Sequence, residues 1–166
     1  PGYHSSSGEL GVTLPTRFRT PYVKGFIDAC AAIGIPANLD YNGAIQEGAS
    51  LVQSTIKNGK RESGATAFLK PVLDRNNLTA ISNAFVEKII LDGKKAVGVQ
   101  YKKGVKTIQV KAQNEIILSA GTYQSPQLLM LSGIGKASEL KMHGIDCVHE
   151  SKGVGKNLQD HLFYPI

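Results

Sequence analysis

The sequence lacks several features that commonly reveal a functional class. It has no Trp and two Cys in 166 residues, and neither Cys30 nor Cys147 belongs to a C-x-x-C pair. The four His are scattered without metal-ligand spacing, so neither a zinc site nor a thioredoxin-type redox site is expected. A disulfide between the two Cys stays open. No apolar run approaches the roughly 18 residues that could cross a bilayer.

Glycine-rich phosphate loops are also missing. Gly133-Ile134-Gly135 and Gly153-Val154-Gly155 both lack the third glycine of G-x-G-x-x-G. Gly155-Lys156-Asn157 has neither the earlier glycine nor the Ser or Thr of a P-loop. No G-x-S-x-G nucleophile elbow surrounds Ser125 or Ser132, so a serine hydrolase is not indicated.

The net charge is +6, and many of the lysines lie in one strand-rich region. They are Lys94, Lys95, Lys102, Lys103, Lys106 and Lys111. Lysines on a sheet edge deter aggregation, which is the plainest interpretation of this group. Without interleaved aromatic residues, a zinc finger or an RNP pattern, no nucleic-acid partner is expected. The sequence does not decide whether the protein associates with a membrane.

The chain predicts a mixed fold of helices and strands. Thr20 and Pro21 begin a helix that ends before Gly34, and Asn58-Gly59 turns the chain after a β-rich stretch. Ser63 caps a short helix expected to stop near Leu69, before Pro71. The strands expected further on cover residues 78–83, 84–91, 96–102 and 106–111, and a helix over 137–143 precedes a strand over 145–149.

The most informative segment covers residues 114–135. Ile116-Ile117-Leu118 predicts a short strand covered on both faces, and Gly121 permits a tight turn. Ser125 is expected to cap a helix whose first residue is Pro126. A strand, a glycine turn and a helix in this order can direct backbone N–H groups toward an anionic cofactor.

This segment resembles the second signature of the glucose-methanol-choline (GMC) flavoprotein oxidoreductases. The matching positions are Gly121, Thr122, Ser125, Pro126, Leu129, Met130, Ser132, Gly133, Ile134 and Gly135. Further segments follow in family order, among them Asp40-Tyr41-Asn42-Gly43, Gly59-Lys60-Arg61-Glu62-Ser63 and Gly153 to His161. They are similar to the choline-dehydrogenase-like and insect glucose-dehydrogenase-like branches.

The resemblance implies an α/β (α+β mixed) fold. Residues 1–77 would be part of a substrate-binding domain. Residues 78–166 would be part of a Rossmann-like FAD-binding domain that carries an antiparallel β meander. The family binds FAD and oxidises alcohols to carbonyls, so the implied partners are a small-molecule alcohol and the remainder of a parent chain, with no metal.

The resemblance also implies cofactor contacts for particular residues. Val86 would reach the adenine of FAD through its main chain, and Ser119, Ala120, Gly121 and Ser125 would lie at the flavin-nucleotide turn. Asp160 would lie at the cofactor edge. From the residues alone, the turn is more typical of a plain strand-to-helix connection, and Val86 is equally compatible with an ordinary strand core.

No catalytic residue is assigned, because the family's catalytic His and its partner lie beyond the matched segments. We therefore expect an internal fragment that is inactive alone and holds FAD weakly. Two alternatives stay open: a hydroxynitrile lyase-like flavoprotein, which holds flavin without net redox turnover, and a non-enzymatic α/β binding module.

Overall fold

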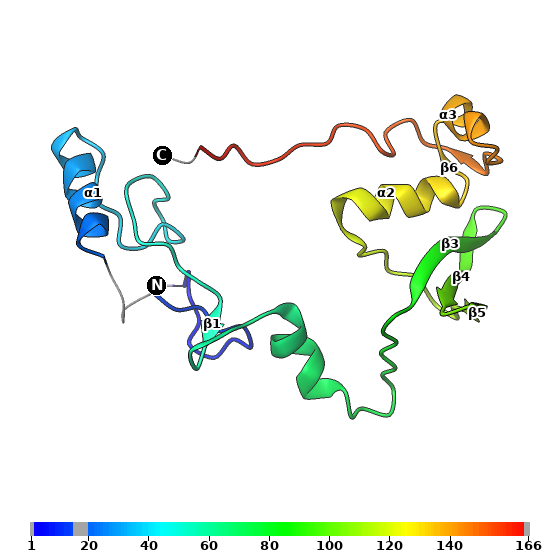
Figure 1. Ribbon diagram of the computed structural model, residues 1–166, viewed down its shortest axis with the longest axis horizontal. Coiled ribbons are helices and arrows are strands. Elements are labelled where there is room, and N and C mark those ends of the chain that lie inside the picture. The colour runs from blue at the N-terminus through cyan, green and yellow to red at the C-terminus, as the bar shows by residue number, and fades with distance from the viewer. Residues whose placement is uncertain (1, 15–19, 165–166) are drawn as a thin grey trace. The chain divides into compact units, whose positions relative to one another are not determined.

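The computed structural model describes residues 2–14 and 20–164 and divides into two compact units, Pro1–Ala80 and Ile81–Ile166 (Figure 1). Each unit has its own elements. Cys30 and Cys147 are both free, so no disulfide joins them. No helix within the described ranges is long and apolar enough to cross a membrane.

The first unit contains one α-helix, α1 (Pro21–Ala32). Thr20 is its extended N-cap residue and Pro21 its first residue, as predicted. Gly34 follows the helix with φ +91°, a conformation that glycine adopts without strain. No residue of α1 is buried, and Tyr22 is 86% exposed.

A hairpin of β1 (Ile56–Lys57) and β2 (Lys60–Arg61) follows in the first unit. Asn58 and Gly59 have φ values of +52° and +72°, as a type I′ turn requires, so the predicted turn is confirmed. The buried carboxylate of Glu62 accepts the N–H of Gly11, which ties the N-terminal segment to this hairpin.

The helical stretch after the hairpin is longer than predicted. A π-helix, η1 (Ala65–Leu69), continues into a 3₁₀ helix, η2 (Lys70–Val72). The Ser63 hydroxyl accepts the Thr66 N–H at 3.3 Å, which agrees with a cap at Ser63. Pro71 does not end the helical stretch, because it lies in the first turn of η2, where its missing N–H removes no bond.

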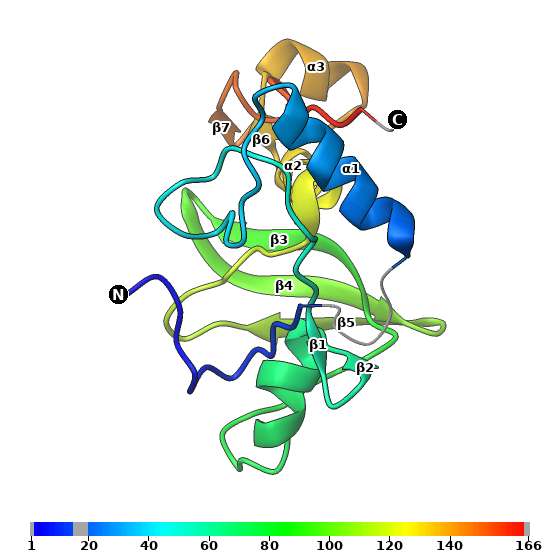
Figure 2. The same ribbon diagram turned by 90° about the vertical axis from the view of Figure 1, so that its left-hand side faces the viewer.

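The second unit is built on an antiparallel meander of β3 (Phe85–Asp92), β4 (Lys95–Lys103) and β5 (Lys106–Lys111), in the order β3-β4-β5 (Figure 2). These three strands are confirmed. The strand predicted over residues 78–83 is wrong, since the described chain there forms no strand. Asn83 has φ +55°, which interrupts the extended conformation directly before β3.

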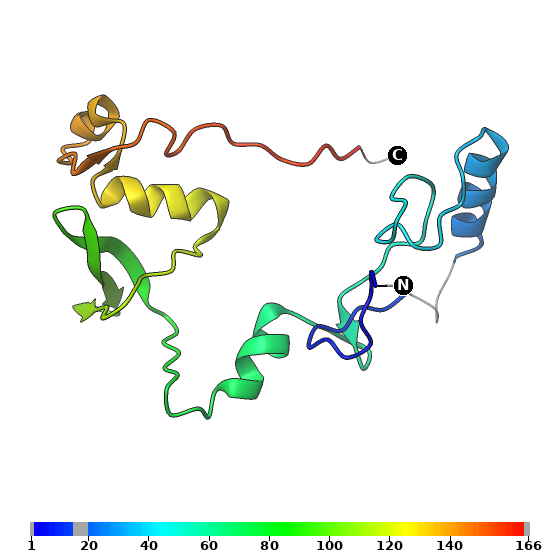
Figure 3. The same ribbon diagram turned by 180° about the vertical axis from the view of Figure 1, so that it is seen from behind.

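Helix α2 (Gly121–Leu131) packs on β3 and provides the core of the second unit (Figures 1 and 3). Leu128 of α2, Ile89 of β3 and Tyr101 of β4 are buried apolar residues of this unit. Ser132, 8% exposed, accepts the Ile89 N–H at 2.8 Å and donates to the Leu128 carbonyl at 2.6 Å. One hydroxyl therefore joins the end of α2 to the middle of β3.

After α2, the second unit contains a parallel pair of short strands with a small helix between them in sequence. Strand β6 (Ile134–Gly135) pairs with β7 (His149–Glu150), and α3 (Ala137–Met142) lies between them in sequence. The predicted strand over 145–149 is wrong in extent. Only Ile134–His149 and Gly135–Glu150 are in register, because β6 offers just two residues to pair with.

We expect Ser132→Ala to destabilise the second unit by about 1–3 kcal/mol, since it leaves the buried Ile89 N–H without an acceptor. Denaturant unfolding and hydrogen exchange of the Ile89 amide measure the effect. Ser138→Ala, at an exposed serine of the same unit, is the control and should change little. Unchanged protection of Ile89 in Ser132→Ala would show that the hydroxyl does not hold β3.

Candidate functional site

The bend before α2 differs from the predicted geometry. The helix begins at Gly121 rather than at Pro126, and its N-cap residue is Ala120. The Ser125 hydroxyl accepts the Ala120 N–H at 3.1 Å, so Ser125 stabilises the bend from the beginning of the second turn of α2. Pro126 leaves the carbonyl of Thr122 without its helical N–H partner, which an exposed first turn tolerates because water can replace it.

The strand predicted over residues 116–118 is also wrong. These residues form no strand, and no other strand within the described ranges pairs with them. Ile117 is 78% exposed, whereas Ile116 and Leu118 are half-buried. The apolar pattern indicates only that these residues favour burial. A β-strand also needs a neighbouring strand to pair with, and none is present beside them within the described ranges.

The bend itself is open. Ser119 and Gly121 are exposed, and Tyr123 is 76% exposed. Gly121 has φ +84°, and a Cβ placed on it would meet no atom within 4 Å. The N–H groups of the first helical turn have no intrahelical acceptor, so this bend offers main-chain donors to an anionic group.

Val86 lies near the beginning of β3, opposite Tyr101. The register shifts between Val86 and Lys88, which leaves Glu87 without a cross-strand partner. Such bulges bend a strand and redirect its main-chain groups, and they are frequent beside binding sites. Because β3 is an edge strand of its sheet, main-chain groups near Val86 can reach a ligand.

Asp160 lies in an exposed segment, residues 155–164, of the second unit. Its carboxylate accepts the N–H of His161 at 2.8 Å, and the His161 ring lies 2.9 Å from the Leu162 carbonyl oxygen. Among the described residues, no hydrogen bond or ion pair joins Asp160 to Val86 or to the bend. One hydrogen bond, from the Ala120 N–H to the Ser125 hydroxyl, joins residues of the bend, and none links the bend to Val86 or Asp160 within the described ranges.

A cleft of about 300 Å³ opens where β3 meets the end of α2. Its lining includes Lys88 to Leu91, Leu131 to Gly133 and Val148. Gly133 has φ +85°, and a Cβ there would lie 2.6 Å from the Asp146 carbonyl oxygen. Sequence reasoning did not identify this cleft, although Ser132-Gly133 of the signature forms part of its wall.

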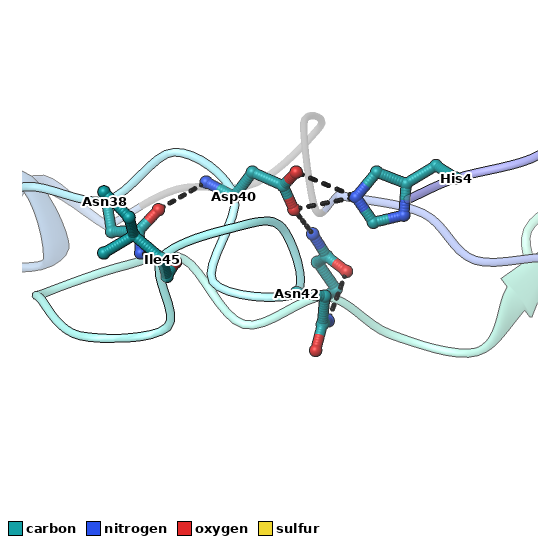
Figure 4. Close-up of polar contacts among 6 residues, drawn as sticks. His4, Asn38, Asp40, Asn42 and Ile45 are labelled. Atoms are coloured by element: carbon teal, nitrogen blue, oxygen red, sulfur yellow. Dashed lines mark hydrogen bonds and ion pairs between the residues drawn. The ribbon is translucent and has the colours of Figure 1, made fainter. Parts of the chain in front are cut away.

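The first unit contains a separate cleft of about 690 Å³. The Asp40 carboxylate there lies 2.8 and 2.9 Å from Nε2 of His4, and the Gln53 amide donates to it at 3.4 Å (Figure 4). The hydrogen bond with His4 and then the charge of that ring hold the pKa of Asp40 below its usual range. Sequence reasoning missed this pair because 36 residues separate its members.

Within the described ranges, no three His, Cys, Asp or Glu side chains come together as a metal site.

Comparison with known proteins identifies the family. The family model described as GMC oxidoreductase matches residues 1–163. The chain therefore belongs to the GMC oxidoreductase family, as its signature predicted. The alcohol dehydrogenase [acceptor] of Pseudomonas putida is 48% identical over 162 residues, which cover 96% of this chain and 29% of that protein. The oxygen-dependent choline dehydrogenase of Brucella ovis is 45% identical over 161 residues, covering 97% of this chain and 29% of that protein.

Solved structures confirm the mixed fold with antiparallel sheets. The FAD-dependent oxidoreductase from Chaetomium thermophilum has a TM-score of 0.87 at 31% identity, over 93% of this chain and 27% of that one. Pyridoxine 4-oxidase from Mesorbium loti has a TM-score of 0.83 at 31% identity, over 95% and 31% respectively. This chain thus spans less than a third of the length of the relatives that it matches.

We expect Gly121→Ala to destabilise the second unit by about 1 kcal/mol, because only the positive φ opposes the new methyl group. Gly133→Ala is the matched comparison and should cost at least about 2 kcal/mol, since its methyl would also clash with the Asp146 carbonyl. Denaturant unfolding measures both. If the two variants lost the same free energy of unfolding, the conclusion that the bend at Gly121 is open would be wrong.

The Asp40–His4 contact predicts a pH dependence in the first unit. Since folding lowers the pKa of Asp40, its contribution to stability is present above the unfolded value of about 4 and is lost as pH falls through the folded value. Thermal unfolding of wild type and Asp40→Asn should therefore differ at neutral pH and converge in acid. In His4→Gln, a carbon-detected NMR titration should return the Asp40 pKa toward its usual range; an unchanged titration would refute the contact.

Proposed function

We propose that this chain is part of an FAD-dependent oxidoreductase that oxidises an alcohol at a CH–OH group. The open main-chain bend over residues 119–121 carries the proposal, because it combines an exposed glycine turn with the family signature. The relatives, an alcohol dehydrogenase and a choline dehydrogenase, support an alcohol substrate.

The residues present fit a flavin nucleotide at two main-chain surfaces. Ser119, Ala120 and Gly121 would lie along the nucleotide, with room at Gly121 for a close approach of the backbone. The Ser125 hydroxyl would act indirectly, by holding the Ala120 N–H and thus the shape of the bend. The β3 main chain at Val86 would contact adenine, and Asp160 would lie at the cofactor edge.

The flavin and this chain would have different roles in the reaction. The flavin would accept the hydride from the alcohol carbon, while the protein supplies position and electrostatics. None of the residues described here is proposed as the base that takes the hydroxyl proton. Residues 78–166 would form part of the FAD cleft, and residues 1–77 part of the substrate-binding domain.

Oxidation is favoured over the alternatives by the relatives. The relatives described above are two dehydrogenases and an oxidase. The hydroxynitrile lyase-like chemistry and the non-enzymatic module therefore have no observation of their own in support.

Titration of the purified chain with FAD tests the proposal at the level of the fragment. We expect weak binding or none and no stable yellow complex, since neither a glycine-rich phosphate loop nor a catalytic pair is present in the sequence. A tight yellow complex would overturn the expectation that the chain alone is insufficient.

A chimera tests the proposed chemistry. Here the chain replaces the 162-residue matching segment of the Pseudomonas putida alcohol dehydrogenase. The chimera should bind FAD, and an alcohol should bleach the flavin under anaerobic conditions. A folded, yellow chimera that no alcohol bleaches would contradict a role of this chain in alcohol oxidation, and a folded chimera without FAD would favour the binding module. Gly133→Ala in the chimera should weaken folding, whereas Gly121→Ala should mainly weaken FAD retention.

A further inference from the structure

The turn between β4 and β5 gathers positive charge at one end of the meander. Lys102, Lys103 and Lys106 are exposed, and Val105 at the tip is 95% exposed. We call these four residues the basic tip. Figure 2 shows this turn at the end of the β4–β5 hairpin, where it extends beyond β3.

The cross-strand register places like charges opposite each other. Lys103 faces Lys106 across the hairpin. Like charges directly opposite destabilise an antiparallel pair. No ion pair within the described ranges involves Lys102, Lys103 or Lys106. The hairpin therefore carries an uncompensated repulsion that an external anionic surface would relieve.

Lysines and exposed apolar side chains lie together near the end of the β4–β5 hairpin. Successive residues of a strand point to opposite faces, so Lys102 and Lys103 extend to different sides. Lys102 is paired with Phe85, which is 69% exposed. Gly104, with φ +59°, closes the turn and leaves Val105 projecting. Lysines thus lie beside Phe85 and Val105, two apolar side chains that are largely exposed.

We propose that the basic tip docks on an anionic phospholipid surface. The lysine ammonium groups would pair with lipid phosphates, and Val105 would enter the apolar part of the interface. Nucleic acid fits less well, because the tip has no Arg and no aromatic residue between its lysines. Protection of the sheet edge explains the positions of these lysines less well. That role would place lysines along the edge strand β5, whereas Lys102 and Lys103 lie on β4 at the turn. The inference is independent of the proposed redox function.

Vesicle sedimentation of the whole 166-residue chain tests the proposal. We expect binding to vesicles of phosphatidylcholine with 30% phosphatidylglycerol, a composition chosen for the assay, and not to pure phosphatidylcholine. Each lysine near an anionic surface strengthens binding about fivefold, so Lys103→Gln with Lys106→Gln should weaken binding roughly 25-fold. Val105→Asp should weaken it with both lysines intact, and salt should weaken it throughout.

The matched control removes the same charge elsewhere in the second unit. Lys141 and Lys152 are exposed, so Lys141→Gln with Lys152→Gln lowers the net charge equally and should change binding only slightly. Circular dichroism compares the folding of all variants. Equal losses in the tip and control variants would overturn the proposal in favour of unspecific attraction by net charge. Absence of binding to anionic vesicles would overturn it outright.

Discussion

The hydroxyl of Ser132 is the contact on which the second unit depends. It lies where α2 ends, and its bonds to Ile89 and Leu128 join a helix to a strand that lies 43 residues earlier in sequence. The next residue extends the junction, because the Gly133 carbonyl accepts the N–H groups of Val148 and His149. Two adjacent residues thus fix α2, β3 and the segment leading into β7, and they form part of the wall of the cleft beside them.

The surfaces proposed to meet FAD are made of backbone rather than of side chains. The bend at Gly121 is open, and the bulge after Val86 frees main-chain groups from the ladder. Sites of this kind tolerate variation in neighbouring side chains but demand particular φ values and local packing. This explains why membership of the GMC family is readable from glycine, serine and proline positions.

Sequence patterns predicted the elements whose signals are local. Thr20-Pro21 and Gly34 delimit α1, and Asn58-Gly59 forms the turn, because caps and turns are decided within a few residues. The predictions that were wrong concern elements whose formation depends on residues outside the local pattern. Residues 116–118 have the composition of a buried strand but no strand beside them, and α2 begins early because Ser125 bonds back to Ala120. Of the candidate site, the sequence predicted the bend; the clefts and the Asp40–His4 pair needed coordinates.

The sequence by itself determined the family, the turns and the order of the meander strands. These depend on the conformational preferences of individual residues and on short hydrophobic periods. The tertiary structure alone decided that Ser132 meets Ile89, that Asp40 meets His4, and that Lys103 opposes Lys106. A pattern states how strongly a residue prefers burial or a given φ, whereas the identity of its neighbour depends on how the whole chain closes around it.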